Sequence, residues 1–219
     1  MHRSIVDQPT SWARRRSDVV TAAVGLVVLV VAMVLVRHGT VAAWERQLFR
    51  AVNDLPRALY PVLWPFQQMG ALGVGIAVAA GAALTRRHRL AVAALVATVA
   101  KLVGERLVKA IVSRQRPGTS IGPDVHLRGD VKLTGESFVS GHAVLITALA
   151  GIVLPYLPGR WKAVPCALVV LVMVTRVYVG AHNPLDVLGG AALGAIIAGI
   201  VNLSLGTPTT QRRTRQEAR

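Results

Sequence analysis

Residues 177–186, VYVGAHNPLD, lie between two long apolar segments of the chain. Within this stretch His182 and Asp186 are four residues apart, and Pro184 is typical of the first turn of a helix. A helix that begins near Pro184 places the imidazole and the carboxylate one turn from each other. Ionisable groups are costly beside hydrocarbon, so this pair predicts a functional site where a membrane-embedded helix begins.

The composition is that of a membrane protein. Of the 219 residues 53% are hydrophobic and only 16% are charged, which is unusual for a soluble domain. The net charge of +15 lies in short basic clusters between apolar runs, and few aromatic side chains are available to stack on bases. We therefore expect no nucleic-acid partner. The single cysteine, Cys166, excludes an internal disulfide and offers no Cys/His spacing for a metal.

Six apolar segments approach the length of about 20 residues that a helix needs to cross the hydrocarbon core. They are 19–36, 62–84, 90–109, 141–157, 163–179 and 184–205. Six crossings put both termini on one side, together with short basic segments at 14–16, 86–89, 160–162 and 212–219. The positive-inside rule then predicts cytoplasmic termini in the inner membrane and a site that faces outward.

The predicted fold is an all-α polytopic membrane domain over residues 18–206, with a basic segment at 1–17 and a basic disordered tail at 207–219. Between the first two spans, the segment 40–55, TVAAWERQLFRAVNDL, predicts one more short helix. Its apolar face carries Val41, Trp44, Leu48, Phe49 and Val52, and its other positions carry Glu45, Arg46, Arg50 and Asp54. The pattern fits a helix in the membrane interface and, equally well, an ordinary amphipathic packing helix.

Polar side chains that are far apart in the sequence fall at the outward ends of the predicted spans. They are Lys109, Arg116, His142, Arg176 and His182. Three cations and two histidines predict a pocket for a multiply charged anion, above all phosphate. Ser140 precedes an apolar run as a helix N-cap, and Gly141 allows a close approach of an anion to the first amides.

The two histidines favour a site with acid–base and nucleophilic chemistry over a site that only stores an anion. A carboxylate such as Asp186 fixes the tautomer of His182 and leaves its other nitrogen free to attack. His142 can then protonate the leaving oxygen and later activate water.

Three motifs together resemble the signature of the type 2 phosphatidic acid phosphatase family, a superfamily that includes vanadium haloperoxidases and glucose-6-phosphatase. They are KAIVSRQRP at 109–117, SGH at 140–142 and RVYVGAHNPLD at 176–186. The resemblance implies a metal-independent phosphatase without a cofactor that passes through a phosphohistidine. It also implies the following roles: His182 as nucleophile, Asp186 as its orienter, His142 as general acid, and Lys109, Arg116, Arg176, Ser140 and Gly141 as the phosphate cradle.

Several other residues leave alternatives open. Val139 and Thr175 stand where the family usually has proline and serine, and Thr175 keeps a hydroxyl. Arg114 is either a snorkelling side chain at the end of a span or part of the site. In the loop 118–138, we expect a solvated face for its polar side chains rather than contacts to a second phosphate. Those side chains are His126, Arg128 and Lys132.

Two further patterns concern the packing of the predicted helices. Lys101, Glu105 and Lys109 are spaced one turn apart, which predicts an ion-paired ladder that makes buried charge tolerable. Gly190 and Gly194 have the small-xxx-small spacing, which we expect to serve packing inside the bundle rather than a dimer.

These patterns predict hydrolysis of a lipid phosphate or a polyprenyl diphosphate at the outer face of the membrane. Substrates with an acyl or a prenyl tail, and with one phosphate or two, fit this expectation. A phosphotransferase with the same intermediate is one alternative. A non-catalytic lipid-phosphate binder or transporter is another, although such a protein has no need for an oriented nucleophile.

Overall fold

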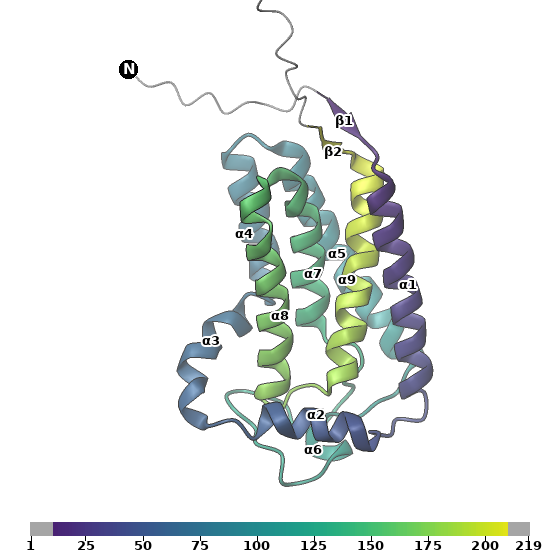
Figure 1. Cartoon of the computed structure of the whole chain (residues 1–219), viewed down its shortest axis with the longest axis vertical. Helices are drawn as coiled ribbons and strands as arrows, with labels where there is room; N and C mark the ends of the chain where they lie inside the picture. The colour runs from purple at the N-terminus through teal and green to yellow at the C-terminus, as the bar shows by residue number, and fades with distance from the viewer. Residues whose placement is uncertain (1–10, 210–219) are drawn as a thin grey trace, which may run out of the picture.

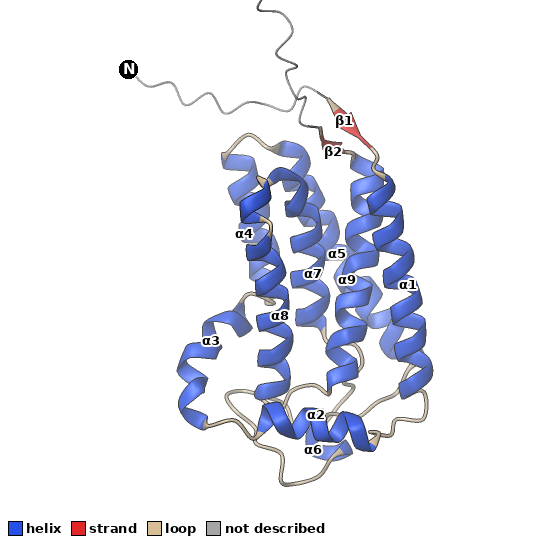
Figure 2. Cartoon of the chain, viewed as in Figure 1, coloured by secondary structure: helices blue, strands red, loops and turns tan. Residues whose placement is uncertain are grey.

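The apolar segments form upright helices that pack side by side, with polar loops at both ends (Figures 1 and 2). The computed structural model describes residues 11–209. The α-helices are α1 (Arg16–Val36), α2 (Ala43–Asn53), α3 (Tyr60–Gln68), α4 (Leu72–Leu84), α5 (His88–Ile111), α6 (Pro117–Ser120), α7 (Gly141–Val153), α8 (Ala163–Tyr178) and α9 (Pro184–Leu205). Short 3-10 turns occupy Arg57–Leu59, Leu154–Tyr156 and Gly159–Trp161. The predicted all-α class is therefore confirmed.

Helix α9 packs between α1 and α7 because glycines line its contacts. A Cβ atom on Gly190 would lie 2.6 Å from the carbonyl oxygen of Ser140, and one on Gly194 would lie 2.5 Å from that of Val144. On the side that faces α1, a Cβ on Gly199 would lie 2.7 Å from the carbonyl oxygen of Asp18. The small residues of α9 therefore serve packing within the bundle, as the sequence predicts.

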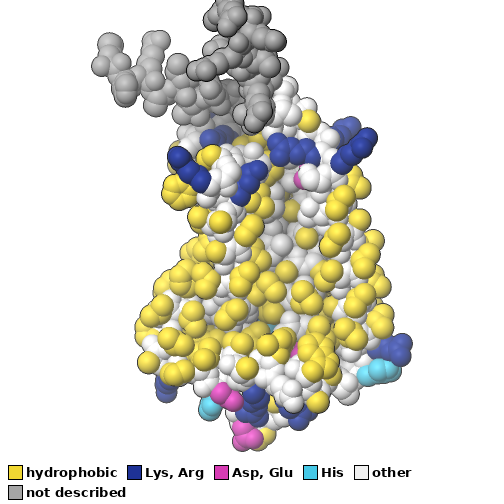
Figure 3. Space-filling view, viewed as in Figure 1, with side chains coloured by type: hydrophobic (Ala, Val, Ile, Leu, Met, Phe, Trp, Pro, Cys, Tyr) yellow, Lys and Arg dark blue, Asp and Glu magenta, His cyan; other side chains and the backbone are white. Residues whose placement is uncertain are grey.

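Exposed aliphatic side chains cover the middle of the bundle on the face seen in Figure 3, and we call the exposed aliphatic side chains of the bundle the apolar belt. Members of this belt include Val27, Ile76, Val99, Leu107, Val170 and Ile200. Lys and Arg cluster at the end where the described termini lie, and charges of both signs lie at the other end (Figure 3). Such a surface is that of a multi-pass membrane protein whose belt faces lipid.

The number of membrane spans is only partly confirmed. In the described residues, α1, the segment Gly159–Tyr178 and α9 are long and apolar enough to cross, and α3 with α4 can form a fourth, bent span. Helix α5 carries several charged side chains, and α7 has only 13 residues. The count of six spans thus stays a prediction for these two helices.

The second predicted span, 62–84, is not one continuous helix. It is divided into α3 and α4, which meet at an angle of 53°. Pro65 lies inside α3, and Gly70 lies at the break, where a Cβ atom would come within 2.5 Å of the Cβ of His142. Proline and glycine are the usual causes of such a break, and here the break brings the backbone against a predicted site residue.

Both described ends of the chain lie at the same end of the bundle. Strand β1 (Trp12–Ala13) pairs antiparallel with β2 (Thr207–Pro208), with Trp12 opposite Pro208. Two residues of the predicted disordered tail are therefore ordered in β2. The remainder of that tail, 210–219, and most of the predicted N-terminal segment, 1–10, lie outside the described residues.

We predict that Gly194→Ala lowers the melting temperature of the detergent-purified protein, because the new methyl group overlaps the backbone of α7. Overpacking of this kind costs about 1–3 kcal/mol. The matched control is Gly81→Ala in α4, where nothing lies within 4 Å of the added Cβ. That control should melt at the wild-type temperature or above it, since alanine is the better helix former. Equal melting of the two variants would contradict the packing described for α9.

Candidate active site

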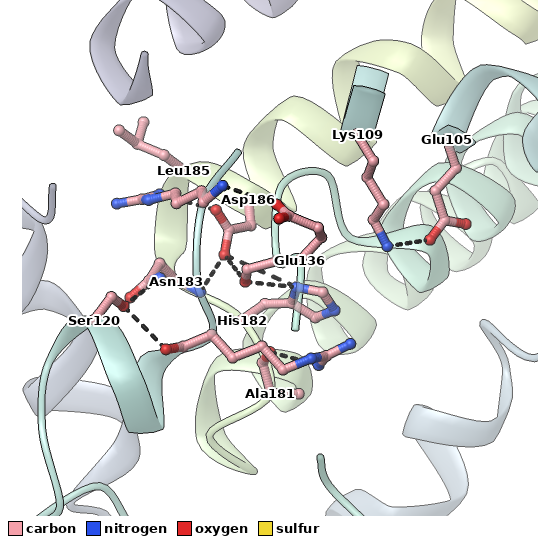
Figure 4. A network of polar contacts seen from close by, with 12 residues as sticks. Glu105, Lys109, Ser120, Glu136, Ala181, His182, Asn183, Leu185 and Asp186 are labelled. Carbon is pink, nitrogen blue, oxygen red and sulfur yellow. Dashed lines mark hydrogen bonds and ion pairs between the residues drawn. The ribbon is translucent and has the colours of Figure 1, made fainter. Parts of the chain in front are cut away.

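The predicted site residues converge at the end of the bundle opposite the described termini. They come from the C-terminal ends of α5 and α8, the N-terminal ends of α7 and α9, and the loops between them (Figures 1 and 4). Arg176 and His182 lie within electrostatic range of His142, and Arg116 lies within range of both Arg176 and His182. The structure thus brings together side chains that are far apart in the sequence between residues 109 and 186.

Asp186 is fully buried on the first turn of α9, and both of its carboxylate oxygens are occupied. Oδ1 accepts a hydrogen bond from Nη1 of Arg114 at 2.8 Å. Oδ2 accepts hydrogen bonds from the backbone N–H of Asn183, at 2.7 Å, and from the hydroxyl of Ser137. The carboxylate is therefore fixed by three donors that come from three different segments.

His182 lies beside this carboxylate without touching it directly. Its Nδ1 is 3.9 Å from Oδ2 of Asp186, which is too long for a hydrogen bond, and 3.4 Å from Oγ of Ser137 (Figure 4). The hydroxyl of Ser137 thus connects the predicted nucleophile to its predicted orienter. Ser137 is not among the site residues predicted from the sequence, because no local pattern relates residue 137 to residues 182 and 186.

Burial lowers the pKa of His182 to about 4, although the nearby carboxylate of Asp186 opposes this shift. The fixed positive charge of Arg176 lowers the pKa further. The imidazole is therefore neutral at neutral pH, which is the state in which a ring nitrogen has a free electron pair. Nδ1 faces Ser137 and Asp186, so Nε2 is the ring nitrogen that points away from this carboxylate.

Arg114 is fully buried, so its interpretation as a snorkelling side chain is wrong. Its Nη1 donates to Oε1 of Glu45 at 3.0 Å as well as to Asp186, and its Nη2 forms an ion pair with Oε2 of Glu45. Burial lowers the pKa of Arg114, but its hydrogen bond to Glu45 and the charge of Asp186 outweigh this and raise it. The guanidinium is thus a permanent cation between two carboxylates.

Glu45 does not lie on a solvated face of α2 but points into the protein. It is 1% exposed, and Phe49 and Asn53, one and two turns later, are fully buried as well. Trp44 and Leu48 are about half exposed, at 51% and 48%, and α2 lies across the end of the bundle (Figure 1). The four-residue spacing of Glu45, Phe49 and Asn53 is the sequence signal that marks the inner face of this helix.

Arg116 and Arg176, which we call the cation cluster, carry positive charge that the described protein groups do not neutralise. Arg176 is 8% exposed, and within residues 11–209 it has no ion pair and its Nε has no partner. Arg116 donates from Nη1 to the carbonyl of Ala181 at 3.0 Å, but its Nε is also unpartnered. The hydroxyl of Ser140 is a further buried group without a partner there. Buried cations of this kind are costly unless an anion binds between them.

Lys101, Glu105 and Lys109 form the predicted ladder on α5. Oε2 of Glu105 is 2.7 Å from Nζ of Lys101. Oε1 of Glu105 is 2.6 Å from Nζ of Lys109, the contact drawn in Figure 4. The Glu105 carboxylate packs directly over Gly141, where any side chain would collide with it. Gly141 therefore makes room for Glu105, a contact that no local sequence pattern predicts, and the anion contact expected of this glycine stays a prediction.

Ser140 occupies the N-cap position of α7, as predicted, but its side chain makes no capping bond. Its backbone N–H instead donates to the carbonyl of Asp186 at 3.0 Å and so joins the starts of α7 and α9.

Val139 and Thr175, the two departures from the family pattern, lie in different surroundings. Val139 is buried, and the hydroxyl of Thr175 donates to the carbonyl of Leu171 at 2.6 Å within α8.

The loop 118–138 is tied to the bundle by Arg128, so the expectation of a solvated face is wrong for this residue. Arg128 is 8% exposed, donates from Nη2 to the carbonyl of Leu55 at 2.8 Å and lies 4.1 Å above the ring of Tyr178. His126 and Lys132 have exposed side chains, as expected. Arg128 therefore fixes the loop next to the site.

Among the residues that the structure describes, no cluster of three or more His, Cys, Asp and Glu side chains is arranged to hold a metal ion. The site groups without a protein partner in the described part of the chain include Nε of Arg116, Nε of Arg176 and the hydroxyl of Ser140. This donor set suits a tetrahedral oxyanion.

Comparison with known proteins gives one family. A family model described as the PAP2 superfamily matches residues 89–209, which contain all three motifs. The chain is 31% identical over 113 residues to an undecaprenyl-diphosphatase of Sulfolobus acidocaldarius, a match that covers 52% of this chain and 54% of that protein. It is 35% identical over 143 residues to a decaprenylphosphoryl-5-phosphoribose phosphatase of Mycobacterium tuberculosis, which covers 64% of this chain and 75% of that protein. The chain thus spans about half the length of the first of these relatives.

Solved structures share the fold. The crystal structure of Aquifex aeolicus LpxE superimposes with a TM-score of 0.67 at 26% identity and covers 74% of this chain and 96% of that one. A transmembrane PAP2 type phosphatidylglycerolphosphate phosphatase from Bacillus subtilis superimposes with a TM-score of 0.66 at 21% identity, over 83% of this chain and 94% of that one. The second likeness shows the fold alone.

We predict that Arg176→Gln weakens the binding of orthovanadate, a tetrahedral anion, at least about tenfold, since a charged hydrogen bond contributes roughly 1.5–3 kcal/mol. Without the anion, the variant should melt no lower than the wild type, because it loses a buried charge that has no protein partner. The matched control is Arg128→Gln, which removes a buried arginine with several acceptors and should lower the melting temperature. Titration calorimetry and thermal melting in detergent measure both effects. Unchanged orthovanadate affinity in Arg176→Gln would contradict the anion site.

Proposed function

Because the chain belongs to the PAP2 superfamily, we propose that it is an integral membrane phosphatase that hydrolyses a lipid phosphate or a polyprenyl diphosphate. One observation carries this proposal: the unneutralised cations Arg176 and Arg116 lie within range of a buried, neutral His182. A binding protein or transporter needs the cations but not a neutral imidazole held beside a fixed carboxylate. Polyprenyl substrates rank first, because both curated relatives are named for them.

The proposed first step is an in-line attack of His182 Nε2 on the phosphorus atom. The bond from nitrogen to phosphorus forms while the bond from phosphorus to the lipid oxygen, or to the terminal bridging oxygen of a diphosphate, breaks. His142 donates a proton to the departing oxygen. Negative charge on the equatorial oxygens is offset by Lys109, Arg116 and Arg176.

The second step releases phosphate and restores the enzyme. His142, now neutral, takes a proton from water, and the resulting hydroxide attacks the phosphorus of the phosphohistidine. The bond between phosphorus and Nε2 breaks, and His182 returns to its neutral state. Asp186, through Ser137, keeps the proton of the imidazole on Nδ1 during both steps.

The position of the site supports a substrate that stays in the bilayer. The site lies at the end of the apolar belt, where a lipid headgroup meets the bundle, and α2 crosses the same end with Trp44 and Leu48 exposed (Figures 1 and 3). The concentration of Lys and Arg at the opposite end supports cytoplasmic termini and an outward-facing site. We propose that the polyprenyl or acyl tail remains in lipid while its phosphate enters the cation cluster.

The experiment that tests this function measures inorganic phosphate released by the detergent-purified protein in EDTA. A polyprenyl diphosphate and a phosphatidic acid are offered in parallel. We expect release that persists in EDTA and falls by at least about a hundredfold in His182→Ala and His142→Ala, since each removes a group used in the chemistry. His126→Ala is the matched control, because this histidine has an exposed side chain, and it should keep wild-type activity.

Each contrary result has a definite meaning. No release from either lipid by the wild type would contradict the hydrolase, and phosphate recovered on an added alcohol instead of in water would identify a phosphotransferase. Equal release by His182→Ala would exclude His182 as the nucleophile. Loss of release in EDTA that added Mg²⁺ restores would contradict metal independence.

A further inference from the structure

The buried carboxylate of Glu45 connects helix α2 to the first turn of α9. Its Oε1 accepts a hydrogen bond from the backbone N–H of Leu185 at 2.9 Å and another from Nη1 of Arg114 at 3.0 Å. Leu185 is the residue immediately before Asp186. Glu45 thus contacts the arginine that binds Asp186 and also the backbone that carries Asp186, although it comes from a helix more than 130 residues away in the sequence.

The guanidinium of Arg114 donates hydrogen bonds to the carboxylates of both Glu45 and Asp186. This arrangement determines which oxygen of Asp186 faces the site. Nη1 reaches Oδ1 of Asp186 at 2.8 Å, while Nη2 is held by Oε2 of Glu45. Oδ2 of Asp186 is thereby left to face Ser137 and His182. If the guanidinium were free to turn, it could bind both oxygens of Asp186 in the usual two-pronged geometry.

We propose that Glu45 is a positioning residue for the reaction, a role that rests on the proposed phosphatase function. By holding the guanidinium of Arg114 and the N–H of Leu185, it keeps Oδ2 of Asp186 directed at Ser137 and His182. It also takes up part of the positive charge of Arg114, so that Asp186 remains a strong acceptor for the hydroxyl of Ser137, whose oxygen faces Nδ1 of His182. The imidazole then keeps Nε2 unprotonated for the attack.

A purely structural role of Glu45 is a poorer explanation of these contacts. Helix α2 has a separate buried anchor in Asn53, whose Nδ2 donates to the carbonyls of His126 and Tyr178, both at 2.9 Å. Three ionised side chains buried together are a costly way to fasten a helix, and apolar packing does so at least as well. Glu45 also lies outside the segment 89–209 that matches the family model, so the family segment does not itself supply this carboxylate.

The test compares Glu45→Gln with Asn53→Ala. Glutamine keeps the size of Glu45 and an oxygen for the N–H of Leu185, and the ion pair between Arg114 and Asp186 remains, so the variant leaves no unpaired buried charge. We expect its kcat for phosphate release from a polyprenyl diphosphate to fall at least about tenfold, with KM and orthovanadate affinity within about twofold of wild type. Asn53→Ala should lower the melting temperature but keep kcat per folded molecule within about twofold.

A second readout is independent of turnover. The ring-nitrogen resonances of ¹⁵N-histidine-labelled protein, with His182 identified by its loss in His182→Gln, report which nitrogen carries the proton. In Glu45→Gln these resonances should shift, and in Asn53→Ala they should stay at the wild-type positions. A shift together with a loss of kcat supports the positioning role.

Three results would overturn the inference: kcat within twofold of wild type in Glu45→Gln, a loss of kcat without a shift of the His182 resonances, or the same loss of kcat in both variants. If the wild type releases no phosphate, the proposed function fails. The resonances of His182 in Glu45→Gln still decide whether Glu45 acts on the imidazole.

Discussion

The rest of this structure depends on one interaction, the guanidinium of Arg114 held between the carboxylates of Glu45 and Asp186. All three side chains are buried, and removal of Arg114 would leave two buried carboxylates without a counter-charge. Through this interaction α2, the loop after α5 and the start of α9 are fixed relative to one another. The loop containing Ser137 is fixed to the same cluster, because the N–H of Ser137 donates to the carbonyl of Arg114 at 2.7 Å.

Around this fixed centre the structure separates two kinds of charge. Arg114, Glu45 and Asp186 form ion pairs with one another, whereas the described protein groups do not neutralise the positive charges of Arg176 and Arg116. His182 lies within range of both, with Nδ1 toward the carboxylate of Asp186 and the charges of Arg176 and Arg116 nearby. A rigid, paired cluster can orient a nucleophile, while unpaired cations can stabilise charge that develops in a transition state.

The sequence was sufficient to predict the helical class, the family and the convergence of the cations and histidines at one end of the bundle. These features follow from apolar segment length and from motifs that keep a fixed spacing, such as the four residues between His182 and Asp186. The family resemblance is confirmed by the match over residues 89–209. The roles assigned to the individual site residues stay predictions.

The remaining features depend on tertiary contacts that no local pattern contains. Glu45 looks like one more charge on an amphipathic helix until α9 is packed against it, and Arg114 looks like the polar end of a span. Ser137 lies in a loop whose path is set by its contacts with the bundle. The break in the span 62–84 has a local signal in Gly70, but the close approach of this glycine to His142 is visible only in the packed structure.

The most direct test of this account is the capture of a phosphorylated enzyme. The wild-type protein is mixed with a polyprenyl diphosphate that carries ³²P in its terminal phosphate. The reaction is stopped in alkali within one turnover, and the protein is then digested and analysed by mass spectrometry. We expect phosphate on His182 that is stable in alkali and lost in acid, as phosphorus–nitrogen bonds of histidine are. Phosphate release without label on the protein, or label on any residue other than His182, would contradict it.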